Sequence, residues 1–290
     1  NFSGTDANNN TLFGKDAGND ITTGDENVAV GGVALDANTT GNSNTAVGHA
    51  ALSANTTASN NVAVGKNALT DNTTGTRNTA AGSYSLDANT TGDDNTAFGW
   101  GSLSASTTAS DNTAIGSYAL NLNTSGSNNT AVGFNSLEKN TTGTNNTALG
   151  SLALDANTTA SHNTAIGNQS IGANTTGEAN TALGQGTLSS NTTASNNTAI
   201  GRQALNQNTT GTQNTAVGAY ALDATTTGNY LTAIGTNALG SNTTGADNTA
   251  VGNNTLTLNT TANSNTAVGR SVLSNNTTGE FNTAIGRGSL

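Results

Sequence analysis

The sequence contains no cysteine, proline or methionine, and only 8% of its 290 residues are charged and 3% aromatic. Without cysteine there is no disulfide framework, no thiolate nucleophile and no zinc–thiolate site, and the chain is compatible with either redox compartment. Leu, Ile, Val and Phe fill 45 of 290 positions, below the roughly 20% under which a chain usually lacks the apolar surface to fold. This composition argues against an ordinary enzyme domain.

The charge balance and the hydropathy pattern limit the partners of the chain. Seven basic residues stand against 17 acidic ones, for a net charge of −10, and so few cations cannot neutralise a row of phosphates. No apolar run reaches the roughly 18 residues of a membrane span, and no charged-then-apolar signal segment opens the sequence. We therefore expect no nucleic-acid partner, no cofactor and no membrane span in this segment.

A glycine that directly follows a short apolar segment recurs every 17 residues. There are 17 such glycines, from Gly14 to Gly286. We number the repeat so that this glycine is position 5, and residues 44–48 then occupy positions 1 to 5. One repeat reads N-T-A-(V/I)-G-x-x-(A/S)-L-x-x-N-T-T-(G/A)-x-x. An uninterrupted period of this kind is typical of solenoids, in which each repeat stacks on its neighbours.

The residue types of the repeat favour strands over helices. Asn, Thr and Gly are poor helix formers, and 17 residues are too few for a helix-turn-helix unit. Thr-Ala-Val-Gly and Ala-Leu form two short extended stretches, joined through an Asn-Thr-Thr-Gly corner. The sequence therefore predicts an all-β fold, a parallel β-solenoid or β-roll with about one repeat per coil, about 17 coils and a coil spacing of about 4.8 Å.

The repeat also predicts the domain organisation. Residues 1–9 precede the first complete register and form an irregular N-terminal lead-in. Residues 10–290 form a single continuous solenoid, whose last coil is incomplete because Leu290 is position 9. Exposed coil ends invite strand pairing, so we expect either that the protein continues beyond this segment or that copies stack head-to-tail into a filament.

Strand alternation assigns the two faces of the coil. Position 4 is Val, Ile, Leu or Phe except at Ala81, so we expect positions 2 and 4 to face the interior with the Leu of position 9. Position 3, Ala in 16 of 17 repeats, then points outward and packs against another chain; alternatively, alanine fits under a neighbouring turn of the same coil. The predicted inter-chain residues are Ala46, Ala63, Ala114, Ala131, Ala148 and Ala165.

Two segments resemble a known family. Residues 60–65, Asn-Asn-Val-Ala-Val-Gly, and residues 26–31, Glu-Asn-Val-Ala-Val-Gly, are similar to the N-S-V-A-I-G signature of YadA-like heads in trimeric autotransporter adhesins. The resemblance implies a left-handed parallel β-roll in which three chains pack side by side. The family's head repeat is shorter, and the 17-residue form with its Asn-Thr-Thr-Gly corner resembles repeats of bacterial surface proteins and of phage or algal-virus fibre-like proteins.

Few residues are candidates for chemistry. No catalytic set and no metal site is expected, since the two histidines share no register position and no Asp column recurs in every coil. Asp94 and Asp111 share position 17 of adjacent coils, which places their carboxylates about 5 Å apart, a spacing that retaining glycosidases use. Outward turn positions that accept any residue are the simpler interpretation. The candidate glycan- or partner-binding residues are Tyr84, Trp100, Tyr118, Phe134, Asp94 and Asp111.

The Asn of position 12 has two interpretations. Thirteen repeats match the N-x-S/T glycosylation acceptor there, beginning with Asn38-Thr39-Thr40. Glycans stacked every 4.8 Å or so would collide, so we favour an internal ladder of Asn side chains that hydrogen-bond from coil to coil.

The repeat predicts a structural function. We expect a rigid extracellular or cell-surface rod, an adhesin head or shaft or a filament subunit, that acts through stiffness and display as a homo-oligomer, with three copies as the first hypothesis. An alternative is an ice- or crystal-surface-binding solenoid that presents Thr of positions 13 and 14 in ranks, of which only one can point outward. A third is a phage or virus fibre that binds or cleaves surface glycans.

Overall fold

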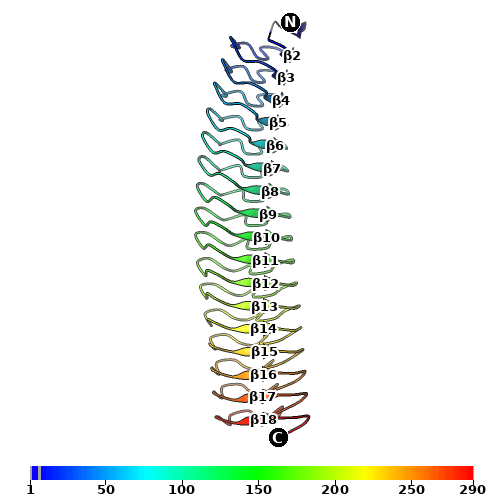
Figure 1. Cartoon of the computed structure of the whole chain (residues 1–290), viewed down its shortest axis with the longest axis vertical. Coiled ribbons are helices and arrows are strands. Elements are labelled where there is room, and N and C mark those ends of the chain that lie inside the picture. The colour runs from blue at the N-terminus through cyan, green and yellow to red at the C-terminus, as the bar shows by residue number, and fades with distance from the viewer. Residues whose placement is uncertain (1, 6–7, 290) are drawn as a thin grey trace. The chain divides into compact units, whose positions relative to one another are not determined.

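The computed structural model describes residues 2–5 and 8–289, and the chain forms two compact units, Asn1–Asn145 and Asn146–Leu290. Each unit is a parallel β-solenoid with one three-residue strand per 17-residue coil (Figure 1). No helix occurs among the described residues. The all-β parallel solenoid is therefore confirmed, while one continuous solenoid over residues 10–290 stays a prediction.

From β2 on, the strands recur at the same three repeat positions, 2 to 4. The first unit contains β1 Phe2–Thr5, β2 Thr11–Phe13, β3 Val28–Val30, β4 Thr45–Val47, β5 Val62–Val64, β6 Thr79–Ala81, β7 Thr96–Phe98, β8 Thr113–Ile115 and β9 Thr130–Val132. The second contains β10 Thr147–Leu149, β11 Thr164–Ile166, β12 Thr181–Leu183, β13 Thr198–Ile200, β14 Thr215–Val217, β15 Thr232–Ile234, β16 Thr249–Val251, β17 Thr266–Val268 and β18 Thr283–Ile285.

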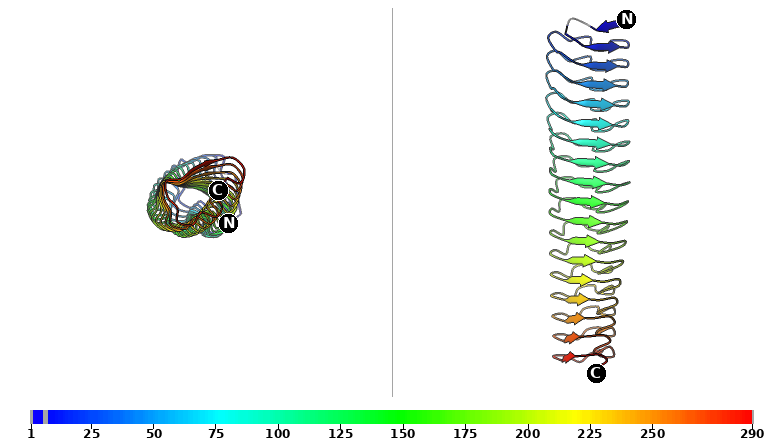
Figure 2. Two further views of the ribbon diagram at one scale, coloured as in Figure 1. Left: turned by 90° about the horizontal axis from the view of Figure 1, so that it is seen from below. Right: turned by 45° about the vertical axis from the view of Figure 1, so that its right-hand side comes forward.

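From β2 on, neighbouring strands of a unit pair in parallel with no register shift, so that like positions stack (Figure 2). The Ala46 backbone, for example, lies beside Ala63, and Ala165 beside Ala182. Backbone hydrogen bonds connect the coils, as where the Val28 N–H donates to the Asn44 carbonyl at 2.8 Å. Each repeat position therefore becomes a column of side chains that follows the solenoid axis.

The N-terminal lead-in is not irregular throughout. Phe2–Thr5 form β1, which pairs antiparallel with β2 and so extends the sheet of the first unit. Residues 1, 6, 7 and 290 lie outside the described part of the chain. The prediction that Leu290 occupies position 9 of an incomplete last coil therefore falls outside the described residues.

The sequence prediction of which strand face is buried is wrong, and the structure shows the opposite assignment. The alanines of position 3 have no exposed surface, apart from the half-buried Ala284 of the last strand, and neither have the leucines of position 9 in most coils. Positions 2 and 4 are half-buried or exposed instead; Ile115 is 41% and Phe98 56% exposed. The interior is narrow because position 3 lies against the rest of the same small coil, so only a methyl side chain fits.

The Ala-Leu stretch is a turn and not a second strand. Position 9 adopts the left-handed conformation, with φ of 54° at Leu35 and 51° at Leu120, and most residues of position 7 do the same. A leucine in this region costs roughly 1–2 kcal/mol. Its complete burial offsets that strain, since burying a leucine side chain contributes about 1.5–3 kcal/mol.

Two internal columns of asparagine form the main polar part of the core. At position 1, the Asn27 side-chain amide donates to the Gly41 carbonyl at 2.9 Å and its Oδ1 accepts the Asn44 N–H at 2.9 Å. At position 12, the Asn55 amide donates to Asn38 Oδ1 at 3.0 Å, and the Asn38 amide donates to the Gly41 carbonyl at 2.9 Å. Buried amides need such partners. The predicted ladder at position 12 is confirmed.

The ladder explains the Asn-Thr-Thr motif without glycosylation. Asn38 and its equivalents have no exposed surface, apart from the half-buried Asn276. An oligosaccharide cannot be accommodated on an interior side chain. The motif therefore serves the coil-to-coil contacts.

We predict that Ser106→Asn stabilises the first unit. Ser106 interrupts the position-12 ladder, and both its hydroxyl and the Oδ1 of the preceding Asn89 are buried without a hydrogen-bond partner. An asparagine there would donate to Asn89 Oδ1 and accept from Asn123, which should add about 1–2 kcal/mol to the free energy of unfolding. Denaturant unfolding of the full chain measures the change.

Thr225→Asn is the matched control at the second interruption of the ladder. The Thr225 hydroxyl already donates to the Asn242 carbonyl at 3.1 Å, and the Asn242 amide lies 3.4 Å from the same hydroxyl. Only Asn208 Oδ1 lacks a hydrogen-bond partner at this interruption, whereas two atoms lack one at Ser106, so the gain should be smaller. A Ser106→Asn chain no more stable than the unmodified chain would contradict the ladder's energetic role.

Candidate functional site

The outward side chains of the strands form one column of Thr and one of aliphatic residues. We call positions 2 and 4 of strands β2 to β9 in the first unit, and of strands β10 to β18 in the second, the outer strip of that unit. Position 2 is Thr except at Val28 and Val62, and neither position carries a charged residue. Exposure is high for large apolar side chains, for example 45% at Leu183 and 41% at Ile234. A contiguous apolar surface of this kind marks an interaction site in a folded protein.

The two edges of the outer strip differ in charge. Most residues at both edges are uncharged, but the charged ones differ in sign: at the strand starts, positions 16 and 17, they are acidic apart from one Arg, and just after the strand ends, at position 6, they are Lys and Arg. The acidic residues are Asp25, Glu26, Asp93, Asp94, Asp111, Glu178, Asp247 and Glu280, with Arg77 among them, and the basic residues are Lys15, Lys66, Arg202, Arg270 and Arg287. Each unit has both kinds of edge.

The two candidate aspartates do not form an acid–base pair. The Arg77 guanidinium binds Asp94 through two hydrogen bonds, Nε to Oδ1 at 2.7 Å and Nη2 to Oδ2 at 2.8 Å. This ion pair lowers the pKa of Asp94 from its ordinary value. A general acid needs a raised pKa, so the geometry gives no support for glycoside hydrolysis at Asp94 and Asp111.

The four candidate aromatic residues lie at the other end of the strands. Trp100 and Tyr118 contact each other edge to face, with ring centroids 4.5 Å apart and an interplanar angle of 87°. Tyr84 lies under the Lys66 ammonium, 5.7 Å from the ring centroid, and Phe134 is 54% exposed. Since Asp94 precedes β7 and Trp100 follows it, the six candidate binding residues fall into two separate groups.

The predicted inter-chain alanines are inside the coil. Ala46, Ala63, Ala114, Ala131, Ala148 and Ala165 all have 0% exposure in a single chain. They cannot present a surface to another chain, and the sequence prediction for them is wrong. The alternative that alanine fits within its own coil is the observed one, and the exposed apolar side chains of the strands belong to the outer strip instead.

The two Thr columns of the corner behave differently. Position 13 hydroxyls donate to the position-13 carbonyl of the next coil, as Thr39 Oγ1 does to Thr56 at 3.0 Å. Position 14 residues such as Thr40 and Thr159 are exposed. One Thr row therefore points outward, as expected.

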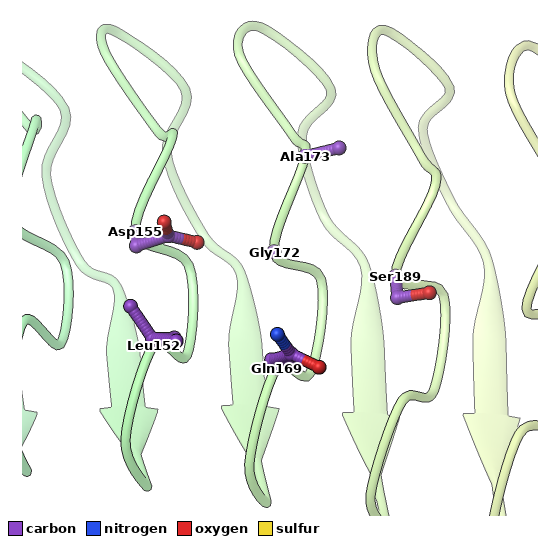
Figure 3. Close-up of a pocket in the computed structure, with 6 residues that line it drawn as sticks. All are labelled: Leu152, Asp155, Gln169, Gly172, Ala173 and Ser189. Carbon is purple, nitrogen blue, oxygen red and sulfur yellow. The ribbon is translucent and has the colours of Figure 1, made fainter.

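A shallow cavity of about 330 Å³ interrupts the surface of the second unit (Figure 3). It opens where Gly172 stands between Asp155 and Ser189 in the position-10 column, and Leu152, Gln169 and Ala173 complete its lining. Asp155 is its one titratable group, so the lining offers no pair for acid–base chemistry.

Across the described part of the chain, no group of three or more His, Asp or Glu side chains is placed to hold a metal ion. In residues 2–5 and 8–289 we also find no helix that could cross a membrane.

Several carboxylates of position 10 have raised pKa values. Burial raises the pKa of Asp87 above 3.8, against the opposing effect of a hydrogen bond from Ser104, and one carboxylate oxygen has no hydrogen-bond partner. Burial also raises the pKa of Asp36 and Asp223. Since the folded pKa exceeds the unfolded one, these charges destabilise the folded chain at neutral pH, and the cost disappears as pH falls through the raised pKa.

Asp87→Asn should therefore raise the melting temperature at pH 7 and reduce the gain in stability that the unmodified chain shows on acidification toward pH 4 or so. Asp94→Asn is the control with the opposite sign, because the pKa of Asp94 is lowered by Arg77 and its charge stabilises the fold above that pKa. Thermal melts of both variants across this pH range measure the effect. If Asp87→Asn lowered the melting temperature at pH 7, the conclusion that the Asp87 charge destabilises the fold would be contradicted.

Searches against protein-family models and against curated proteins find no match to this chain.

Proposed function

We propose that the chain is a structural segment of an extracellular or cell-surface fibre, in which parallel copies of the solenoid associate through the outer strip. The exposed aliphatic column of position 4 is the observation that carries this proposal. An adhesin head or shaft built from three copies is the form that the YadA-like motif implies. Rigidity follows from the regular stacking of coils within each unit, and the function needs no catalysis.

The size of the outer strip is adequate for association. Each three-residue strand presents a face of about 10 by 4.8 Å, so the strands of one unit present about 400 Å², or about 800 Å² when both copies are counted. About 800 Å² per pair of units lies near the lower end of the interfaces that weak or transient complexes bury. A long apolar strip of this size gains by burial against a second copy.

The charge of the two edges favours parallel copies. Around any rotation axis that follows the solenoid, the strand starts of one chain lie beside the strand ends of the next. The acidic edge of one copy then meets the basic edge of its neighbour, which stabilises the pairing and selects against antiparallel copies. Dimers and trimers both satisfy this arrangement, and the motif resemblance favours three.

The test adds two charges to the strip. Leu149→Arg combined with Leu183→Arg, at side chains 46% and 45% exposed, should leave the fold intact and reduce the mass to that of a single chain in sedimentation equilibrium. Thr159→Arg combined with Thr193→Arg is the matched control, because these exposed threonines occupy position 14 of the same two coils. An unmodified chain that is monomeric at micromolar concentration would refute the proposal.

A second candidate function is binding to ice or another crystal surface, favoured by the uncharged Thr row of position 14. Its outward hydroxyls repeat at the coil spacing, about 4.8 Å, whereas the strip's position 4 varies from Ala81 to Phe98 and does not form an even plane. The unmodified chain would then show thermal hysteresis, and the double substitution Thr159→Arg and Thr193→Arg would abolish it. That result would favour this function over the first. If the unmodified chain gave no more thermal hysteresis than buffer alone, binding to ice would be excluded.

A further inference from the structure

Four aromatic side chains gather beyond the ends of β6 to β9, and the outer strip does not include them. We call Tyr84, Trp100, Tyr118 and Phe134 the aromatic patch. Each follows the glycine of position 5 by one or two residues. Trp100 is 47% and Phe134 54% exposed, so burial in the core does not account for them.

The central pair of the patch is held in place by its surroundings. Gly101, with φ of 62°, lies beside Tyr118, and a Cβ there would come within 3.3 Å of the Tyr118 ring. The missing side chain thus leaves room for Tyr118 to pack against Trp100 edge to face. The Asn121 amide donates to the Gly101 carbonyl at 2.8 Å and fixes the backbone of this turn. The rings are therefore ordered before any ligand binds, which lowers the entropic cost of binding.

The spacing of the patch follows the coil repeat. Trp100 and Phe134 share position 6 two coils apart, which separates them by about 10 Å along the solenoid. Ser83 and Ser117 occupy position 6 in the alternate coils, so hydroxyl and aromatic side chains alternate along the column. Such a row offers ring faces for stacking and polar groups for hydrogen bonds.

The geometry points to a carbohydrate-binding site at the aromatic patch, for an extended, unbranched β-1,4-linked glycan. In such a chain every second sugar presents the same apolar C–H face, and the length of two sugars is close to the separation of Trp100 and Phe134. The sugars between them would meet the Ser117 hydroxyl and the Tyr118 ring. No acidic residue occurs at positions 6 or 7 of these four coils, so the site does not repel weakly acidic chains.

The chain's single tryptophan reports directly on this site. Titration of the full chain with cellohexaose or chitohexaose should shift Trp100 fluorescence, whereas maltohexaose, with its helical α-linked chain, should not. Phe134→Ala and Tyr118→Ala should each weaken binding at least tenfold. Tyr230→Ala is the matched control, because Tyr230 is also exposed, at 59%, but lies in the other unit.

Three results of the titration would overturn the carbohydrate-binding site. No response to either β-linked hexasaccharide, an equal response to maltohexaose, or binding unchanged by Phe134→Ala would each overturn the inference. A change of oligomeric mass in Phe134→Ala without any glycan response would assign the patch to contacts between copies and also overturn it. The site does not rest on the proposed fibre function, because a monomeric chain that binds the β-linked sugars would refute the fibre and leave the site intact.

Discussion

Ala165→Arg should unfold the coils around β11 and make them accessible to protease. The Ala165 side chain has no exposed surface and lies directly beside Ala182 in the next strand. An arginine there adds a large volume and an unpaired charge to a closed interior, which should cost about 4–5 kcal/mol. Because solenoid stability depends mainly on neighbouring coils, the loss should remain local. Limited proteolysis with mass spectrometry should locate new cleavage sites near residue 165.

Ile166→Arg is the matched control for this prediction. Ile166 is the next residue of the same strand, but its side chain belongs to the half-exposed outer strip. The same charge at this position should leave the chain folded and resistant to protease, and should weaken association of copies. Protease sensitivity in Ile166→Arg together with resistance in Ala165→Arg would mean that the two faces of the strand are assigned the wrong way round.

The sequence predicts the fold class but not which face of the strand is inside. The 17-residue period and the strand-forming residues define a parallel solenoid, and both are visible in the chain alone. Ranking by hydrophobicity then places position 4 inside, because Val, Ile and Leu are usually buried. Position 4 varies from Ala81 to Phe98 in adjacent coils, which a narrow interior cannot accommodate. The constancy of size at position 3 was therefore the better guide to burial than apolar character.

The core itself depends on features that no residue pattern shows. Leucine at position 9 in the left-handed region is unexpected, since this conformation normally favours glycine or asparagine. It allows the chain to reverse direction while the side chain fills the coil. The Asn column of position 12 was easier to predict, because a polar residue that repeats in most coils needs a partner in the next coil, whereas the buried Asn column of position 1 was not predicted.

The candidate site could be predicted only in part. The register correctly places Tyr84, Trp100, Tyr118 and Phe134 along one edge, but it does not reveal that Trp100 packs on Tyr118 while Tyr84 pairs with Lys66. Those contacts depend on the stagger between positions 6 and 7 of successive coils. The Arg77–Asp94 ion pair, which removes the supposed dyad, likewise depends on side-chain reach between coils.

Gly116→Val should be among the most damaging single substitutions in the chain. Gly116 has φ of 130°, a region that is essentially restricted to glycine. A Cβ at this residue would lie 2.5 Å from the Gly133 carbonyl oxygen and 2.7 Å from its carbon. Backbone strain and a clash with the next coil therefore act together, and we expect a loss of more than about 4 kcal/mol in the free energy of unfolding. Denaturant unfolding and limited proteolysis would both record it.

Gly126→Ala is the control that separates the effect of a restricted backbone conformation from the effect of a steric clash with the next coil. Gly126 occupies position 15, where a Cβ would also approach the next coil, at the Gly143 carbonyl oxygen. Its φ is not positive, and other coils already carry alanine there, as at Ala109 and Ala160. A small shift of the coil therefore accommodates the methyl group, and the cost should stay near 1 kcal/mol. If both variants melted at similar temperatures, position 5 would not be restricted to glycine by its backbone, and the invariance of that column would need another cause.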